Sequence, residues 1–230
     1  MGRFRLSVGV VCLALATSVV RAAPPPKALP PDEVAALAAR IDQLIETSYP
    51  ESQVKPAPLA DDAEFVRRVY LDLAGRIPRV SEVHKFLDDK SPNKRRALVE
   101  DLLRGPHYVN HFTNVWRALL LPQNNNQQVQ FLAGQIEGWV RPRLRDNKPY
   151  DQMVRELLTA PVVFNGGMPQ RNRPDFGAIA FYQANESKPE NVAAATSRLF
   201  LGIKLECAQC HNHPFARWSR KQFWEYAAFF

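Results

Sequence analysis

The feature that most constrains this chain is the spacing of its apolar residues, which recur every three or four positions along most of its length. Val34, Leu37 and Ile41 show this period near the beginning, and Met153 and Leu157 repeat it later. Such spacing places side chains on one face of an α-helix, ready to pack against a core. No alternating strand pattern of any length occurs. The sequence therefore predicts a mainly α fold, an irregular multi-helix domain with long loops and no substantial sheet.

Capping residues, prolines and glycines divide these apolar stretches into separate helices. A first helix is expected from Asp32 to about Ser48, followed by a linker over residues 50–58. Later helices are bounded by polar caps or proline at the start and by glycine at the end. The start signals are Asp61 or Asp62, Ser81, Ser91 with Pro92, Pro106, Pro189 and Ser219 with Gln222, and the stop signals are Gly75, Pro78 and Gly105. Residues 123–128 and 160–176 are expected to be long connections.

The N-terminus carries a different kind of signal. Arg3 and Arg5 precede an uncharged apolar run over Leu6–Val20, and small residues follow it. The run is too short for a stable transmembrane helix and has the order of a secretory signal peptide. We expect residues 1–22 to be removed by cleavage after Ala22. An uncleaved N-terminal anchor is the alternative.

Removal of this segment leaves a mature chain with little net charge. Residues 23–31 form a proline-rich leader that cannot join a helix or sheet, and residues 32–230 form the folded helical domain. The full chain has a net charge of +7, and the loss of three arginines and no acid lowers it to +4. So small and evenly spread a charge argues against nucleic acid as a partner. The protein would contact a membrane only through an uncleaved signal.

The cysteines point to one site. Cys12 lies in the expected signal peptide, so Cys207 and Cys210 are the only thiols of the mature protein. They are two residues apart and His211 follows at once, which is the pattern of c-type haem attachment. On one tight turn, two such thiols reach neighbouring vinyl groups of a porphyrin edge, and the adjacent histidine reaches the iron as the proximal axial ligand. We predict one haem c at this motif.

Other interpretations of the same residues remain open. Cys207, Cys210, His211 and His213 offer four donors that zinc accepts, although ligands on so short a segment rarely close a tetrahedron. A thioredoxin-like redox pair would need a strand before the turn, and none is expected. A plain disulfide, with both histidines as structural polar residues, is the third alternative.

The distal side of the iron is less defined by the sequence. His213 is too near in sequence to reach the opposite face of the ring, so candidates lie upstream. They are Met168 in the 160–176 connection, which packing explains least, then Met153, His107 and His111. Met153 already has a place in a helical stripe. An open position, or a ligand from a C-terminal part that follows Phe230, is equally compatible.

The residues near the motif include four aromatic side chains and no catalytic constellation. Phe215, Trp218, Phe223 and Trp224 either wall the porphyrin edge or form a core cluster, and the core interpretation is favoured. No Ser-His-Asp set, phosphate loop or pair of catalytic carboxylates stands out. The sequence therefore gives no positive case for an enzyme within this chain.

Several segments carry a resemblance to a known family. They are Arg198–Phe215, Arg217 with Trp218, the aromatic stretch to Phe230, Phe65–Leu73, Gly75–Pro78 and Trp116 with Arg117. Together they resemble the second planctomycete-type cytochrome-like domain, over residues 35–230. The resemblance implies an exported multidomain protein of unassigned activity, with another domain following this one. The cytochrome label rests on the same Cys-x-x-Cys-His motif, so it is not independent support for haem.

These observations combine into one functional prediction with two alternatives. We expect an exported, periplasmic or envelope-associated domain of a larger protein, truncated at Phe230, that binds haem c and transfers electrons to a redox partner protein or a downstream domain. The first alternative is a non-haem structural or interaction module in which the motif is a disulfide or metal clip. The second is an enzyme whose catalytic half lies beyond Phe230.

Overall fold

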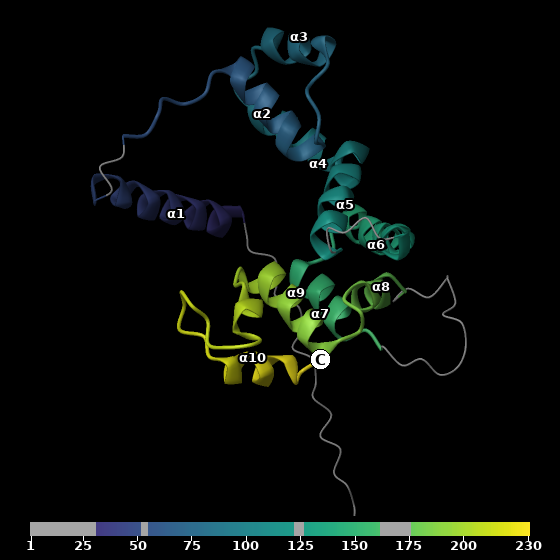
Figure 1. The fold of residues 1–230 in the computed structure, drawn as a ribbon. Helices are drawn as coiled ribbons and strands as arrows, with labels where there is room; N and C mark the ends of the chain where they lie inside the picture. Colours follow the sequence, from purple (N-terminus) through teal and green to yellow (C-terminus); the bar gives the residue numbers. More distant parts are fainter. Residues whose placement is uncertain (1–30, 52–54, 122–126, 162–175) are drawn as a thin grey trace, which may run out of the picture. The chain divides into compact units, whose positions relative to one another are not determined.

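A computed structural model describes residues 31–51, 55–121, 127–161 and 176–230 of this chain. In these ranges the structure consists of α-helices and one short 3-10 helix and contains no strand, which confirms the mainly α prediction (Figure 1). The chain divides into two units, Met1–Pro58 and Leu59–Phe230. The predicted signal peptide and Met168 lie outside the described residues. Across the described helices, none combines the length and apolarity needed to span a membrane.

The first unit contains helix α1 (Pro31–Glu51). The predicted helix is confirmed, but it begins one residue earlier and continues past Ser48 to include Pro50. A proline this close to the C-terminal end removes one hydrogen bond from the last turn, and the helix tolerates it. The apolar stripe that was expected to face a core is half-exposed, at 51% for Val34 and 49% for Ile41. Within the described part of this unit, no second helix is present to cover it.

The second unit begins with three helices around a small apolar core. They are α2 (Asp62–Ala74), α3 (Val80–Asp88) and α4 (Lys94–Arg104). The predicted cap at Asp61 is confirmed, since its side chain accepts a hydrogen bond from the Glu64 N–H at 2.8 Å. Gly75 ends α2 as predicted, with a left-handed φ of 65°. A Cβ at Gly75 would also overlap the ring of His111. The core is formed by Val66, Tyr70, Ala74, Phe86 and Leu102.

Two predicted helix starts in this group are wrong. α3 begins one residue before Ser81, because the Glu82 carboxylate accepts a hydrogen bond from the Arg79 N–H at 2.6 Å and so caps the first turn. α4 begins at Lys94, after the expected Ser91-Pro92 start, because the Lys94 N–H bonds to the Ser91 carbonyl at 3.3 Å in a turn that precedes the helix.

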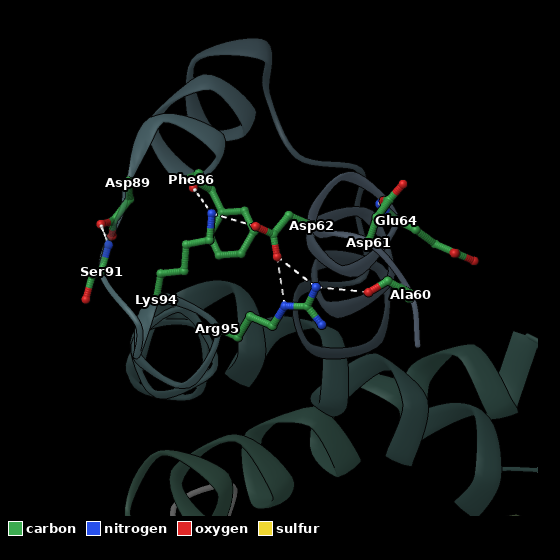
Figure 2. Close-up of polar contacts among 9 residues, drawn as sticks. All are labelled: Ala60, Asp61, Asp62, Glu64, Phe86, Asp89, Ser91, Lys94 and Arg95. Carbon is green, nitrogen blue, oxygen red and sulfur yellow. Dashed lines mark hydrogen bonds and ion pairs between the residues drawn. The ribbon is translucent and has the colours of Figure 1, made fainter. Parts of the chain in front are cut away.

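A polar cluster joins the N-terminal ends of α2 and α4 (Figure 2). Asp62 accepts a hydrogen bond from Arg95 Nε at 2.8 Å and lies 2.6 Å from Lys94 Nζ. Arg95 also donates to the Ala60 carbonyl at 2.9 Å, and Lys94 to the Phe86 carbonyl at 3.3 Å. Hydrogen bonding to Lys94 and then Arg95 lowers the pKa of the Asp62 carboxyl. The cluster thus fixes the α4 end against both neighbouring helices.

The largest core lies among five further helices. They are α5 (Pro106–Leu120), α6 (Gln127–Arg145), α7 (Tyr150–Leu158), α8 (Phe176–Ala184) and α9 (Pro189–Leu201). The predicted starts at Pro106 and Pro189 are confirmed. Helix α8 was not predicted: it is apolar on all sides, and seven of its nine residues are buried. A Cβ at Gly177 would overlap Trp139 of α6, so the two helices approach closely at this glycine.

The chain after α9 folds back onto it. Gly202 ends α9 with a left-handed φ of 67°. A 3-10 helix, η1 (Leu205–Ala208), and a last helix, α10 (Arg220–Ala227), follow. The predicted capping box of α10 is confirmed, since Ser219 and Gln222 each bond to the other's backbone N–H, at 2.9 and 3.2 Å. A third apolar cluster joins these elements, and it consists of Ala193, Leu205, Ala208, Phe223 and Ala227.

Candidate functional site

The two thiols of the motif point away from the apolar cluster beneath them. Leu205 and Ala208, three positions apart on η1, are both buried, at 6% and 0% exposure. In a 3-10 helix residues three apart share one side. Cys207 lies off this side and is exposed, and Cys210, which follows η1, is exposed as well. Both thiols are unbonded and accessible to a reagent or cofactor.

The hydrogen bonding of His211 defines which ring nitrogen is available. Its Nδ1 lies 2.7 Å from the backbone oxygen of Asn212. A carbonyl oxygen can only accept, so Nδ1 carries the proton and Nε2 keeps its lone pair. Metal-binding histidines have this arrangement, in which the non-ligating nitrogen donates to a carbonyl or carboxylate. The exposed His211 ring therefore presents an unprotonated Nε2, one residue after the exposed Cys210.

His213 has the opposite arrangement. Its Nδ1 accepts hydrogen bonds from the backbone N–H groups of Phe215 and Ala216, at 3.1 and 3.0 Å. In the neutral ring the proton then lies on Nε2, which is a donor rather than a ligand. Its own N–H donates to the Trp218 carbonyl at 2.8 Å and closes the loop. The structure thus uses His213 to shape residues 213–218.

The ligand-type side chains of the motif are not gathered around one point in the described residues. Within the described ranges, no three His, Cys, Asp or Glu side chains lie together in a group suited to holding a metal ion. His213, which the zinc interpretation requires, has its ring committed to the backbone of its own loop. A haem c site requires fewer protein groups, because two thiols and one imidazole suffice.

Three hydrogen bonds tie the motif to helix α10. The side-chain oxygen of Asn212 accepts from the Arg220 N–H at 3.0 Å, which satisfies a free donor at the helix start. The Gln209 carbonyl accepts from Trp224 Nε1 at 3.2 Å and from Arg220 Nε at 3.4 Å. The peptide groups between the two cysteines and after His211 are therefore fixed by a helix from further along the chain.

The four aromatic residues near the motif divide into two pairs. Phe223 is 0% exposed and belongs to the apolar cluster, and Trp218 packs against it. These two follow the core interpretation. Phe215 is 94% exposed and Trp224 is 41% exposed. The exposed ring of Trp224, which bonds to the Gln209 carbonyl between the two cysteines, and the exposed ring of Phe215 are apolar surface that a flat, apolar group is able to cover.

The upstream candidates for a distal ligand lie elsewhere in the fold. Met153 is 4% exposed in the core of α5–α9, so its helical stripe explains it. His111 packs against Gly75 and the ring of Phe112, and His107 lines a hollow beside α2–α4. Met168 is outside the described residues. The structure brings none of these three described side chains into the apolar cluster of the motif.

Sequence reasoning missed the residues that support the motif. Asn212 and Gln209 act through tertiary hydrogen bonds, and only the position of Asn212 a few residues before a capping box hinted at such a role. Glu206 was also missed. One of its carboxylate oxygens is buried without a hydrogen-bond partner among the described residues, directly before Cys207.

Comparison with known proteins gives one result. The family model described as PSCyt2, a protein of unknown function (DUF1549), matches residues 40–230. No curated protein and no solved structure matches the chain. The matched range begins within α1 and includes every helix of the second unit, together with the motif.

Proposed function

The chain belongs to the PSCyt2 family of unknown function, and on this premise we propose that it is an exported domain that attaches one haem c through Cys207 and Cys210 and transfers electrons. The observation that carries the proposal is the hydrogen bond from His211 Nδ1 to the Asn212 carbonyl, at 2.7 Å. It leaves Nε2 available as a ligand, and the two thiols that precede it in the motif are exposed and unbonded.

The donor set fits the group. Cys207 and Cys210 would form the thioethers, and His211 would be the proximal ligand. Bound haem supplies a one-electron iron couple, the chemistry that an electron carrier needs. Asn212 serves twice, because its carbonyl orients the His211 ring while its side chain anchors the turn to α10.

The surroundings of the motif supply apolar cover and charge. Phe215 and Trp224 offer exposed ring surface where a porphyrin would remove it from water. Glu206, with a buried carboxylate oxygen, places negative charge beside the attachment point. Negative charge in a poorly solvated position stabilises the more positive, oxidised iron. We therefore expect Glu206→Gln to raise the reduction potential of the loaded protein.

The test is covalent loading. The chain is expressed with a c-type maturation system, denatured and analysed by mass spectrometry and by absorption in the Soret region. We expect one haem mass that survives denaturation, and its loss in the Cys207→Ala, Cys210→Ala double variant. His211→Ala should alter the Soret and visible bands, since it removes the axial ligand.

A matched control tests whether a loss of haem loading is specific to the residues of the motif. His107→Ala removes an exposed histidine of α5 and should load as the unaltered chain does. Colourless protein with free thiols, with a Cys207–Cys210 disulfide, or with stoichiometric zinc would contradict the proposal and support the structural module instead.

Export and partners belong to the same proposal. The order of Arg3, Arg5 and the apolar run Leu6–Val20 supports a signal peptide. N-terminal sequencing of periplasmic material should find the mature chain beginning at Ala23. An intact N-terminus in the membrane fraction would instead support the uncleaved anchor. The electron acceptor or donor we propose is a redox partner protein or a downstream domain of the same polypeptide.

A further inference from the structure

A cavity lies among α5, α7, α9 and the turn between α8 and α9. Its volume is about 880 Å³, and Trp116, Leu119, Tyr150, Asn185, Asn191 and Arg198 are among the residues that line it. Sites for small molecules in proteins typically measure about 300–1,000 Å³ and combine apolar walls with a few convergent polar groups. The size and the lining of this cavity meet both conditions.

One wall of the cavity is aromatic. The rings of Trp116 on α5 and Tyr150 on α7 have centroids 6.0 Å apart and planes inclined by 40°. Tyr150 is 58% exposed, and Trp116 only packs against the edge of the core. Their faces are therefore available to a ligand, whereas most aromatic rings of this core are enclosed.

The opposite wall supplies both donors and acceptors. Asn185 is 9% exposed, and its Nδ2 donates to the Phe181 carbonyl at 2.8 Å. This bond fixes the amide and leaves Oδ1 as an acceptor. Arg198 of α9 contributes a guanidinium, which only donates, and Asn191 contributes a second amide. A ligand here meets hydrogen-bond acceptors and donors side by side.

The turn that carries Asn185 is held in an unfavourable backbone conformation. Glu186 and Ser187 both have left-handed φ angles, 59° and 50°, although neither is glycine. The turn is closed by hydrogen bonds from the Ser187 N–H to the Tyr182 carbonyl at 2.8 Å and from the Lys188 N–H to the Asn185 carbonyl at 3.2 Å. Consecutive strained residues persist where the surroundings enforce them, and such positions cluster at ligand sites.

The cavity is separate from the cysteine motif. Asn191, Ala194 and Arg198 lie at helical spacing on the face of α9 that lines the cavity. Ala193 lies on the opposite face, where it packs with Leu205 of the motif cluster. Helix α9 therefore stands between the two sites, and neither shares its lining with the other.

We propose that this cavity binds a neutral carbohydrate. A sugar has an apolar ring face that stacks on aromatic side chains, and hydroxyl groups that donate and accept at once. The Trp116–Tyr150 wall matches the first property, and Asn185 and Arg198, which both line the cavity, match the second. The charged groups of the lining are one acid, Glu186, which pairs with Lys188 at 2.6 Å, and one base, Arg198, so the lining has no net positive charge that selects an anion. A purely apolar ligand would leave the lining amides unpaired.

Calorimetric titration of the whole chain with cellotetraose, xylotetraose, mannotetraose and maltotetraose tests the proposal. We expect saturable binding of at least one of them. Tyr150→Ala and Arg198→Ala, both at exposed positions, should weaken it about tenfold or more. Phe229→Ala removes an exposed aromatic residue outside the cavity and should leave binding unchanged. Circular dichroism of each variant confirms that the helices remain folded.

Three outcomes would overturn the proposal. They are no heat of binding with any of the four sugars up to about 10 mM, equal binding by the Tyr150 and Arg198 variants, and saturable binding of benzoate or inorganic phosphate in their place. The Cys207→Ala, Cys210→Ala variant should bind the sugar as the unaltered chain does. The outcome is therefore independent of whether the motif attaches haem.

Discussion

Helix α8 and the motif segment 205–219 are fixed in the molecule by opposite means. In α8, seven of nine residues are buried, and Phe181 is entirely enclosed. In the motif segment, Cys207, Cys210 and His211 are exposed, and backbone and side-chain hydrogen bonds to α10 hold the turn. Apolar contact encloses α8, whereas the motif segment buries only one side, through Leu205 and Ala208, and directional bonds hold its exposed turn.

This contrast explains where the proposed chemistry lies. Burial of apolar surface is the dominant stabilising contribution, but it encloses the groups that provide it. Thiols and an imidazole that receive a cofactor must remain accessible, so they lie on the exposed side of a turn that hydrogen bonds to α10 help to position. Such segments open locally at lower free energy than the core does. Four changes test this distinction, in order of decreasing expected effect.

The largest effect is expected from truncation in α8. Phe181→Ala leaves a cavity in the main core and should lower the free energy of unfolding by about 3–5 kcal/mol. Phe215→Ala, at a 94% exposed position of the motif segment, should change it by less than about 0.5 kcal/mol. Urea denaturation of both variants measures the difference. Comparable losses in the two would contradict the contrast.

A small residue of α8 should matter almost as much. Gly177→Ala places a methyl group against Trp139 Cβ and the Gln135 carbonyl, and should cost about 1–3 kcal/mol of stability by overpacking. Gly134→Ala on α6, where nothing lies within 4 Å of the added group, should stabilise by about 0.5–1 kcal/mol. Thermal unfolding of the pair should give shifts of opposite sign. A stabilising Gly177→Ala would show that α6 and α8 are not closely packed.

The third change concerns helices α2–α4, where an ion pair also contributes to stability. The bidentate Arg76 guanidinium, helped by the Arg79 N–H, lowers the pKa of Glu82 to about 2 from 4.5. A depressed carboxyl pKa stabilises the fold above the unfolded pKa, and this stability is lost as the pH falls from 4.5 towards 2. Glu82→Gln should lower the free energy of unfolding by about 1–2 kcal/mol at pH 7, and it should reduce the loss of stability that accompanies falling pH.

The control for this change is an exposed pair. Glu100→Gln interrupts the Arg96–Glu100 contact on the surface of α4 and should alter stability by less than about 0.5 kcal/mol. Chemical denaturation at several pH values measures both variants. If the stability of Glu82→Gln falls with decreasing pH as steeply as that of the unaltered chain, another carboxyl group causes the pH dependence.

The smallest effect is expected in the motif segment. Asn212→Ala leaves the Arg220 N–H without its partner and should weaken the attachment to α10 by about 1 kcal/mol. Hydrogen exchange at the Arg220 amide should then become roughly fivefold faster. Asn212→Asp keeps an acceptor at the start of a helix and should retain protection. Unchanged exchange in the alanine variant would mean that other contacts hold the turn.

Sequence reasoning succeeded where a local pattern suffices. The caps at Asp61 and Ser219 and the helix starts at Pro106 and Pro189 were predicted, because each depends on residues within one turn of the boundary. The start at Ser81 was wrong, because Glu82 competes for the same first turn and also pairs with Arg76. Serine alone does not decide which of several nearby groups caps a helix.

The least predictable parts depend on distant contacts or on side-chain hydrogen bonds that residue spacing does not show. Helix α8 gave no helical stripe, because a helix that is apolar on all sides has no polar face to reveal its period. The spacing of His213 made it a possible ligand, and only the fold shows its ring committed to Phe215 and Ala216. Asn212 gains its role from Arg220, eight residues later.

By itself, the sequence determined the helical class, most boundaries and the place of Cys207, Cys210 and His211 on one turn, because these follow from periodicity and spacing over a few residues. The tertiary structure alone decided that α8 is enclosed, that α9 separates a cavity from the motif, and that Arg220 and Trp224 of α10 anchor the turn of the motif. These depend on side chains brought together from distant positions, and no local pattern records such encounters.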